Sequence, residues 1–270
     1  MLTLTFVRHG ETVANKSRTI QGQSDGCLTK LGALQAERLG HRLAKEHFDV
    51  IICSDLLRTQ QTAACIMKCR PMQNVYLEPM VRERAAGVLE GKGYGTHEKM
   101  AKAAGISSRL YSPERGESWQ DVMKRAEIFA RRLAETFLAP HTDMQSTRPP
   151  HGNPLPSRSS PRKVSILLVT HGGFIKEFIN QWCRLGRGSS LYPNKAQNTS
   201  LFQFHIKCRP GYLLPCVHLQ VENDISHLTG WQCTDENQEK ACCVSLENLH
   251  TKSIPWSDVY SSRKELSGKI

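Results

Sequence analysis

The sequence predicts a three-layer α/β protein whose central, mostly parallel sheet is flanked by helices. Three observations indicate this fold class. Short apolar runs recur along the chain, longer amphipathic stretches separate them, and the two most apolar runs, residues 2–7 and 164–169, each end in a polar motif. Strands that alternate with helices form layered sheets that are covered on both faces and joined by right-handed crossovers.

The expected elements follow one another in a regular order. Apolar runs predict strands over 2–7, 49–53, 75–78, 164–169, 200–206 and 212–219. Apolar residues at helical spacing predict helices over 30–46, 55–69, 117–138 and 173–184. The helix over 117–138 is the longest, so we expect it to cover much of one face of the sheet.

A polar segment interrupts this pattern. Residues 140–162 are rich in Pro, Ser and Arg and carry almost no apolar side chains. Such a segment cannot offset its ordering entropy by burial, so we expect a mobile insertion within one domain that spans 1–228. Residues 229–270 show no clear periodicity and are interpreted as a C-terminal extension of unknown role.

Composition narrows the range of functions. No apolar run approaches the ~20 residues that span a bilayer, and residues 2–7 are too short for a signal peptide. The ten cysteines lack the paired spacing of zinc sites, so we expect reduced thiols, a cytoplasmic location and no structural metal. The net charge of +11 is scattered along the chain, which favours a small anionic substrate over nucleic acid.

Two histidines follow the two strongest strand patterns. Residues 2–7 lead into Arg8-His9-Gly10, and residues 164–169 lead into Thr170-His171-Gly172. Ligands of parallel sheets bind beyond the carboxyl ends of the strands. We therefore expect both histidines to lie at one edge of the sheet, within a ligand site.

The residue types at this edge match the needs of phosphoryl transfer. A neutral imidazole is a nucleophile near pH 7, and arginine offers paired donors to phosphoryl oxygens. We predict that His9 attacks phosphorus and that Glu83 protonates the leaving group and then activates water. No metal cofactor is required, since arginines and a histidine replace the cation. The groups predicted to bind the phosphoryl oxygens or the substrate phosphate are Arg8, Asn15, Gln21, Gly22, Arg58, His171 and Gly172.

Four motifs together resemble the histidine phosphatase superfamily, which includes the phosphoglycerate mutases. They are R-H-G-E-T at 8–12, S-D-L-x-R-T-x-x-T at 54–62, R-E-R-x-x-G at 82–87 and T-H-G at 170–172. The resemblance covers roughly residues 2–206. It implies a phosphoglycerate mutase-like fold and supports the roles given above.

A narrower resemblance is to TIGAR-type fructose-2,6-bisphosphatases. It is carried by residues 87–92, 100–104, 116–122 and 216–228. It implies hydrolysis of the 2-phosphate of fructose 2,6-bisphosphate, lowered glycolysis, diversion of sugar into the pentose phosphate pathway, and activity on bisphosphoglycerate. It also allows for locations in the nucleus or at mitochondria. Ala85-Ala86 departs from the larger or aromatic pair that such relatives often carry, which puts the substrate fit in question.

Other interpretations remain open at this point. The same fold could serve a mutase, a phosphatase of other small phosphates or of phosphoproteins, or a partner-binding scaffold at mitochondria. Arg58 and Glu83 could form ordinary ion pairs, and Asn15, Gln21 and Gly22 could only shape a loop. Glu11 and Glu90 are the alternative acids if Glu83 is not the proton donor. Three further histidines are expected at the surface: His41, His47 and His97.

Overall fold

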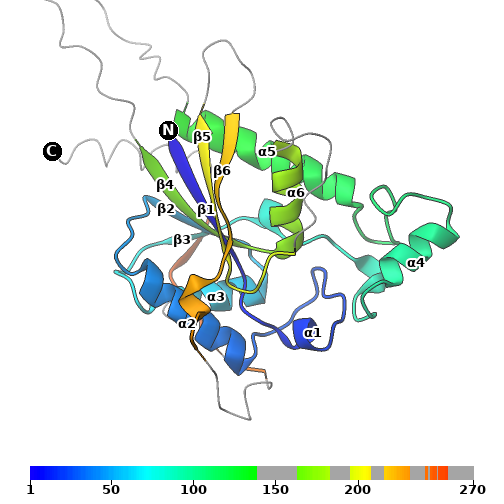
Figure 1. The fold of residues 1–270 in the computed structure, drawn as a ribbon, viewed down its shortest axis with the longest axis horizontal. Coiled ribbons are helices and arrows are strands. Elements are labelled where there is room, and N and C mark those ends of the chain that lie inside the picture. Colours follow the sequence, from blue (N-terminus) through cyan, green and yellow to red (C-terminus); the bar gives the residue numbers. More distant parts are fainter. Residues whose placement is uncertain are drawn as a thin grey trace, which may run out of the picture.

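The computed structural model describes residues 1–138, 163–182, 195–207, 216–231, 241–242, 244–247 and 249–254. Within this part of the chain, one seven-stranded sheet has the order β6-β5-β1-β4-β2-β3-β7 (Figure 1). Four of its neighbouring pairs are parallel, and β5 is antiparallel to both β1 and β6. The predicted mostly parallel sheet is therefore confirmed.

Two long neighbouring strands form the centre of the sheet. These are β1 (Leu2–Arg8) and β4 (Val164–Thr170), and in each strand six of the seven residues are buried. The remaining strands are β2 (Val50–Cys53), β3 (Val75–Leu77), β5 (Leu201–Lys207), β6 (Cys216–Asp224) and β7 (Thr251–Ser253). The last of the predicted strands, over 212–219, thus extends farther toward the C-terminus than expected.

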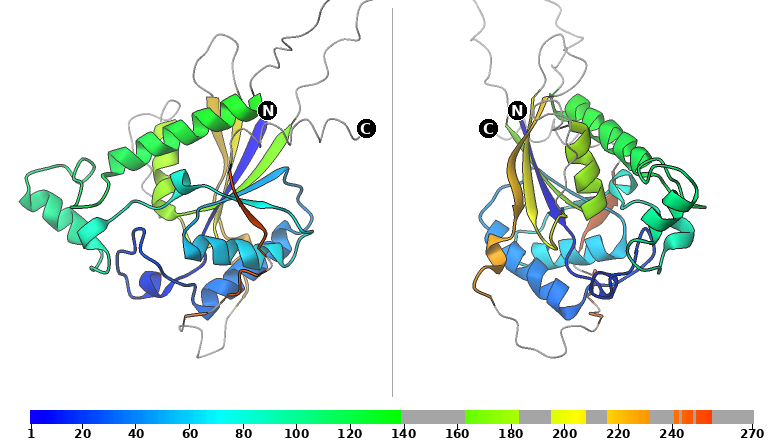
Figure 2. Two further views of the ribbon diagram at one scale, coloured as in Figure 1. Left: turned by 180° about the vertical axis from the view of Figure 1, so that it is seen from behind. Right: turned by 45° about the vertical axis from the view of Figure 1, so that its right-hand side comes forward.

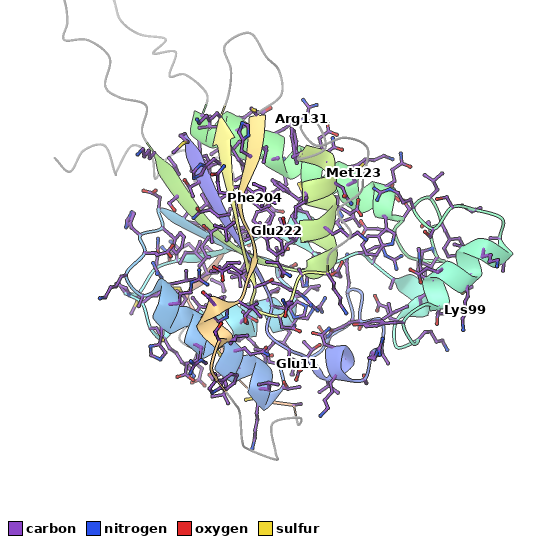
Figure 3. All side chains as sticks on the ribbon, in the orientation of Figure 1. Glu11, Lys99, Met123, Arg131, Phe204 and Glu222 are labelled. Carbon is purple, nitrogen blue, oxygen red and sulfur yellow. The ribbon has the colours of Figure 1, made fainter. Side chains whose placement is uncertain are left out.

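Helices cover both faces of the sheet, as Figure 2 shows. On one face, α5 (Trp119–Leu138) and α6 (Gly172–Trp182) pack over a core that includes Phe6, Phe129 and Phe174. On the other face, α2 (Lys30–Leu43) and α3 (Leu57–Met67) pack over Val7, Leu167 and Val169. This arrangement confirms the predicted three layers. In Figure 3, Phe204 of β5 lies within the sheet, and its ring packs against Phe6 and Phe178 at the first of these cores.

Smaller elements lie beyond the carboxyl end of the sheet. They are α1 (Val13–Lys16), α4 (Thr96–Ala103) and the short 3-10 turns Pro79–Val81, Gly87–Leu89 and Ser226–Leu228. Helix α4 projects to the side of the molecule (Figure 1). The expectation that His97 lies at the surface is wrong: its ring is 3% exposed, because it packs edge-on against Tyr111 and Trp119. His41 and His47 are exposed as predicted.

Part of the C-terminal segment belongs to the same fold. Strand β7 pairs with β3 and becomes the edge of the sheet. Leu249, just before it, is 7% exposed and packs in the core beneath α2 and α3. The predicted insertion at 140–162 lies outside the described residues. Among the described helices, none is long and apolar enough to cross a membrane.

Candidate active site

Two histidines lie beside each other at the point where β1 and β4 end. The parallel pairing of these strands brings His9 and His171 to the same edge, with ring centroids 5.3 Å apart. His9 Nδ1 lies 2.8 Å from the carbonyl oxygen of Gly10, and His171 Nε2 lies 2.8 Å from the hydroxyl oxygen of Ser54. A carbonyl oxygen only accepts, so Nδ1 of His9 carries the proton and Nε2 keeps a free lone pair.

The surroundings favour the neutral form of both rings. Burial is the main cause that lowers the pKa of His9 well below its usual value, followed by the charges of Arg8 and Arg58. Burial likewise lowers the pKa of His171, and Arg58 is the next cause. An imidazole with such a pKa is neutral at pH 7, which is the form that has a lone pair for nucleophilic attack.

Two arginines are buried next to these rings. Arg8 Nη1 donates to the carbonyl oxygen of Ala196 at 2.6 Å, and Arg58 Nη2 donates to the carbonyl oxygen of Gly22 at 2.7 Å. Burial lowers the pKa of both guanidinium groups, that of Arg58 to about 10, so Arg58 remains charged near pH 7. Gly172 leaves room beside Arg8, because a Cβ atom there would lie 3.3 Å from Arg8 Nε.

Three buried nitrogen atoms at this edge have no hydrogen-bond partner in the described part of the protein. They are Arg8 Nε, Arg58 Nε and His171 Nδ1. Leaving a buried donor unpaired is costly, more so when the group is charged. An oxyanion at this edge would give these donors acceptors, so the arrangement is that of an anion-binding site.

Residues 54–62 form hydrogen bonds that position the groups of the site. Besides Ser54, which contacts His171, the Thr62 hydroxyl accepts from the backbone N–H of Gly10 at 3.0 Å and donates to the carbonyl of Arg58 at 2.7 Å. The turn after β2 and the first turns of α3 therefore position the loop after β1, the second histidine and an arginine together. These contacts explain why Ser, Arg and Thr occur at fixed positions in the 54–62 motif.

Glu83 reaches the same edge from a separate loop. Its Oε1 accepts from the backbone N–H of Arg84 at 2.8 Å, and its Oε2 accepts from the backbone N–H of Gly173 at 2.9 Å. The absence of a side chain at Gly173 permits this position, because a Cβ atom there would lie 2.0 Å from Glu83 Oε1. The first turn of α6 therefore fixes the carboxyl group.

The loop after β1 completes the surround. Asn15 Oδ1 accepts from Asn198 Nδ2 at 3.0 Å, and the same Asn198 nitrogen donates to the carbonyl oxygen of His9. Gln21 Oε1 accepts from the hydroxyl of Thr12 at 3.1 Å. Gly22 has φ +56°, a conformation that suits glycine, and its carbonyl orients Arg58. These residues thus line the site and also hold one another.

A pocket of about 400 Å³ opens at this edge. It is lined by all the predicted residues except His171, which lies against His9. Glu11 and Glu90 are not among its lining residues; they accept hydrogen bonds from Thr29 and Gln23 instead. Several further residues line the pocket that were not predicted from the sequence: Arg84, Tyr94, His97, Glu98, Trp119, Lys176 and Lys195. Arg84 and Trp119 lie within segments quoted above but were given no role there, and the other five follow no strand pattern. Among the described residues, no group of three His, Cys, Asp or Glu side chains is placed to hold a metal ion.

Comparison with known proteins agrees with this geometry. The model of the histidine phosphatase superfamily, branch 1, matches residues 4–139, about half of the chain. The chain belongs to the histidine phosphatase superfamily. This family match, together with the phosphatases among its relatives, identifies the protein as a phosphatase of this superfamily.

Sequence comparison with individual relatives shows which members of the superfamily this histidine phosphatase is similar to. It is 35% identical over 188 residues to fructose-2,6-bisphosphatase TIGAR B of Danio rerio, covering 65% of this chain and 73% of the relative. It is 30% identical over 264 residues to fructose-2,6-bisphosphatase TIGAR of Mus musculus, covering 84% and 96%. The resemblance to TIGAR-type proteins is therefore confirmed.

Solved structures of the superfamily share the fold of this histidine phosphatase. Bacillus stearothermophilus YhfR matches with a TM-score of 0.64 and 27% identity over 84% of this chain and all of that one. Phosphoglycerate mutase from Bacillus anthracis matches with a TM-score of 0.63 at 21% identity over 84% of this chain and 95% of that one, a likeness of fold alone. The predicted phosphoglycerate mutase-like architecture is thus confirmed.

Proposed function

We propose that this phosphatase hydrolyses phosphomonoesters through a phosphohistidine on His9 and that its substrate is fructose 2,6-bisphosphate. The observation that carries the proposal is the set of unpaired buried donors around His9: Arg8 Nε, Arg58 Nε and His171 Nδ1. They surround a neutral imidazole whose Nε2 lone pair is free. Phosphoryl transfer requires hydrogen-bond donors that are already in place around the nucleophile, where they stabilise the negative charge of the phosphoryl oxygens.

In the first step, His9 Nε2 forms a bond to phosphorus while the bond from phosphorus to the leaving oxygen breaks. Arg8 and Arg58 donate to the phosphoryl oxygens. The hydroxyl of Ser54 donates to His171 Nε2, which keeps the His171 proton on Nδ1, where it is directed to a phosphoryl oxygen. In this scheme Glu83 enters the step as the carboxylic acid and passes its proton to the leaving oxygen.

In the second step, the roles of acid and base reverse. Glu83, now ionised, takes a proton from a water molecule as that water attacks phosphorus. The bond between phosphorus and His9 Nε2 breaks, and its electron pair returns to the imidazole. Inorganic phosphate leaves, and Glu83 holds the proton needed for the next turnover. In this scheme, the wall of the phosphate-binding site is shaped by Asn15, Gln21, Gly22 and Gly172.

The choice of substrate rests on the relatives. Two of them, each aligned over more than two thirds of its own length, are named fructose-2,6-bisphosphatases. A third, 30% identical over 190 residues, is named a broad-specificity phosphatase of Saccharomyces cerevisiae, which makes hydrolysis of several small phosphates the second candidate. Hydrolysis of fructose 2,6-bisphosphate would lower glycolysis and favour the pentose phosphate pathway. We place this activity in the cytoplasm, where the six described free cysteines would stay reduced.

A trapping experiment tests the mechanism. Wild-type protein, mixed rapidly with 32P-labelled fructose 2,6-bisphosphate in buffer with EDTA, should yield a phosphoprotein that is labile in acid and stable in base. His9→Ala should give no labelled protein and no turnover, with an unchanged circular dichroism spectrum. A His9→Ala protein with near-normal phosphate release would refute the mechanism. A panel that includes bisphosphoglycerate, sugar monophosphates and a phosphopeptide would separate the two substrate candidates.

A further inference from the structure

The rim of the pocket carries positive charge that the proposed reaction does not use. Lys176 and Lys195 both line the pocket, and so does Tyr94. In the described part of the chain, neither lysine forms an ion pair with a carboxylate. Two lysines thus line a site that already contains the arginines needed for one phosphoryl group.

Lys195 is held by an aromatic ring. Its Nζ lies 4.7 Å from the centroid of the Tyr94 ring. The face of an aromatic ring attracts an ammonium group through its quadrupole but carries no net charge. A carboxylate would cancel the charge of Lys195, whereas the ring restrains the side chain and leaves its positive charge and its N–H donors available to a ligand.

The position of Tyr94 is fixed by backbone contacts. The backbone N–H of Tyr94 donates to the carbonyl of Arg18 at 3.0 Å, and that of Ile20 donates to the carbonyl of Lys92 at 2.7 Å. Thr19 and Gly93 form an isolated bridge between the same two segments. Tyr94 is 42% exposed, so its ring is presented at the rim and not packed in the core.

Lys195 is linked to the reacting end of the pocket by its neighbour. The carbonyl of Ala196 accepts from Arg8 Nη1 at 2.6 Å. Because Lys195 directly precedes Ala196, the hydrogen bond between Ala196 and Arg8 also restrains the position of Lys195. This restraint sets the distance between the Lys195–Tyr94 pair and the reacting phosphoryl group.

Lys176 approaches the same region from α6. It follows Gly172 by four residues, so the two positions share one face of the helix about 6 Å apart. Gly172 adjoins Arg8, since a Cβ atom there would lie 3.3 Å from Arg8 Nε. Lys176 thus lies one turn of α6 beyond Gly172, which adjoins Arg8 at the site of the reacting phosphoryl group.

We propose that Lys195, restrained on the Tyr94 ring and assisted by Lys176, forms a second anion subsite for the phosphoryl group that is not hydrolysed. This subsite makes the enzyme select bisphosphates over monophosphates. The proposal rests on the proposed phosphatase function and adds the residues that determine its substrate class. It does not require that the bisphosphate be a fructose derivative.

The test compares two classes of ligand on one set of variants. Hydrolysis of phenyl phosphate, which has a single anionic group, is measured alone and with fructose 2,6-bisphosphate or 2,3-bisphosphoglycerate as a competitor. Lys195→Ala should raise the inhibition constant of each bisphosphate about tenfold more than it raises the KM for phenyl phosphate, as expected for the loss of one charge-assisted hydrogen bond. Added salt should shrink this difference.

Conservative variants separate charge from shape. Lys195→Arg should restore most of the preference, and Tyr94→Phe should retain more of it than Tyr94→Leu, because phenylalanine keeps the ring face. Lys99→Ala is the control, since Lys99 lies on α4 away from the sheet and does not line the pocket (Figure 3); it should leave both constants as in the wild type.

Two outcomes would overturn the subsite. One is an equal effect of Lys195→Ala on phenyl phosphate and on the bisphosphates, and the other is no effect on either. Failure of the proposed function appears differently: phenyl phosphate would not be hydrolysed, or fructose 2,6-bisphosphate would inhibit without being turned over. In the second case, the inhibition constants still test the subsite.

Discussion

Among the described residues, only backbone groups donate hydrogen bonds to the Glu83 carboxylate, which makes a substitution that keeps its shape informative. Its two carboxylate oxygens accept from the N–H groups of Arg84 and Gly173 at 2.8 and 2.9 Å. Glu83→Gln retains the shape but cannot donate a carboxylic proton. We expect it to slow phosphorylation of His9 by a sugar phosphate ~100- to 10,000-fold, and by nitrophenyl phosphate much less, because nitrophenolate leaves without protonation. Single-turnover kinetics measure both rates.

Arg58→Ala provides the contrast for this experiment. It removes a donor to the phosphoryl group and should slow both substrates, whatever the leaving group. Equal slowing of the two substrates by Glu83→Gln would mean that Glu83 is not the proton donor. Neither alternative acid, Glu11 or Glu90, lines the pocket, so either would have to act through a different arrangement of the loops that carry them.

At the residue scale, the sequence predicts the groups that follow strong strand patterns. His9 and His171 were placed correctly at one edge because the short, apolar runs 2–7 and 164–169 favour buried strands. The contacts behind them could not be predicted, since Ser54 meets His171 across 117 positions of sequence. Lys195 was missed for a related reason: an isolated lysine has no pattern, and only the fold brings it to Tyr94.

At the scale of elements, buried segments were predicted well and exposed ones were not. The helix predicted over 117–138 is α5, Trp119–Leu138, because its apolar face is continuous. Helix α4 has few buried residues, and the three residues of β7 are all exposed. Strand β7 is held by backbone pairing with β3 and by Leu249 before it, and neither gives an alternating apolar pattern.

The segment around β7 should contribute measurably to stability. Leu249 is 7% exposed and packs in the core beneath α2 and α3. Leu249→Ala should lower the free energy of unfolding by about 2 kcal/mol, the lower end of the usual cost of removing a buried leucine side chain. Urea titration of the variant measures the loss. Catalysis should persist under native conditions, since Leu249 does not line the pocket.

Two truncations test the same segment as an element. Ending the chain after residue 231 removes β7 and exposes the edge of β3, so it should destabilise the protein more than Leu249→Ala does. Ending it after residue 254 keeps both β7 and Leu249 and should retain that stabilisation. Equal stability of the two truncated proteins would show that β7 adds nothing to the fold.

At the scale of the whole molecule, the site is a meeting point of distant segments. His9, Arg58, Glu83, His171 and Asn198 come from five separate parts of the chain. Each is held by a hydrogen bond to another of these parts, for example Arg58 to Gly22 and Glu83 to Gly173. Such a site can form only when the complete sheet and its helices have assembled, so conditions that unfold the domain also dismantle the site.

This coupling leads to a prediction for pH. Burial lowers the pKa of His9, His97, His171 and His227, that of His227 to about 4. In the unfolded chain these rings titrate near 6.5, so below that pH the unfolded state binds protons that the folded state does not. Stability is therefore unaffected by these groups above pH 7 and falls as the pH drops through 6.5 toward 4. Urea titrations at pH 7, 6 and 5 should show a steady decrease in the free energy of unfolding.

The histidine contribution can be separated from that of the carboxylates. Arg42 lowers the pKa of Asp224 to about 2, so the stability from this carboxylate is present above its unfolded pKa and is lost only as the pH falls from about 4 to 2. Within pH 7 to 5, His227→Gln should therefore flatten the decline, because the variant no longer takes up this proton on unfolding. His41→Gln is the control, since His41 is exposed and forms no ion pair with a carboxylate among the described residues. A free energy of unfolding that stays constant between pH 7 and 5 would show that the buried histidines are protonated as readily in the folded protein as in the unfolded chain.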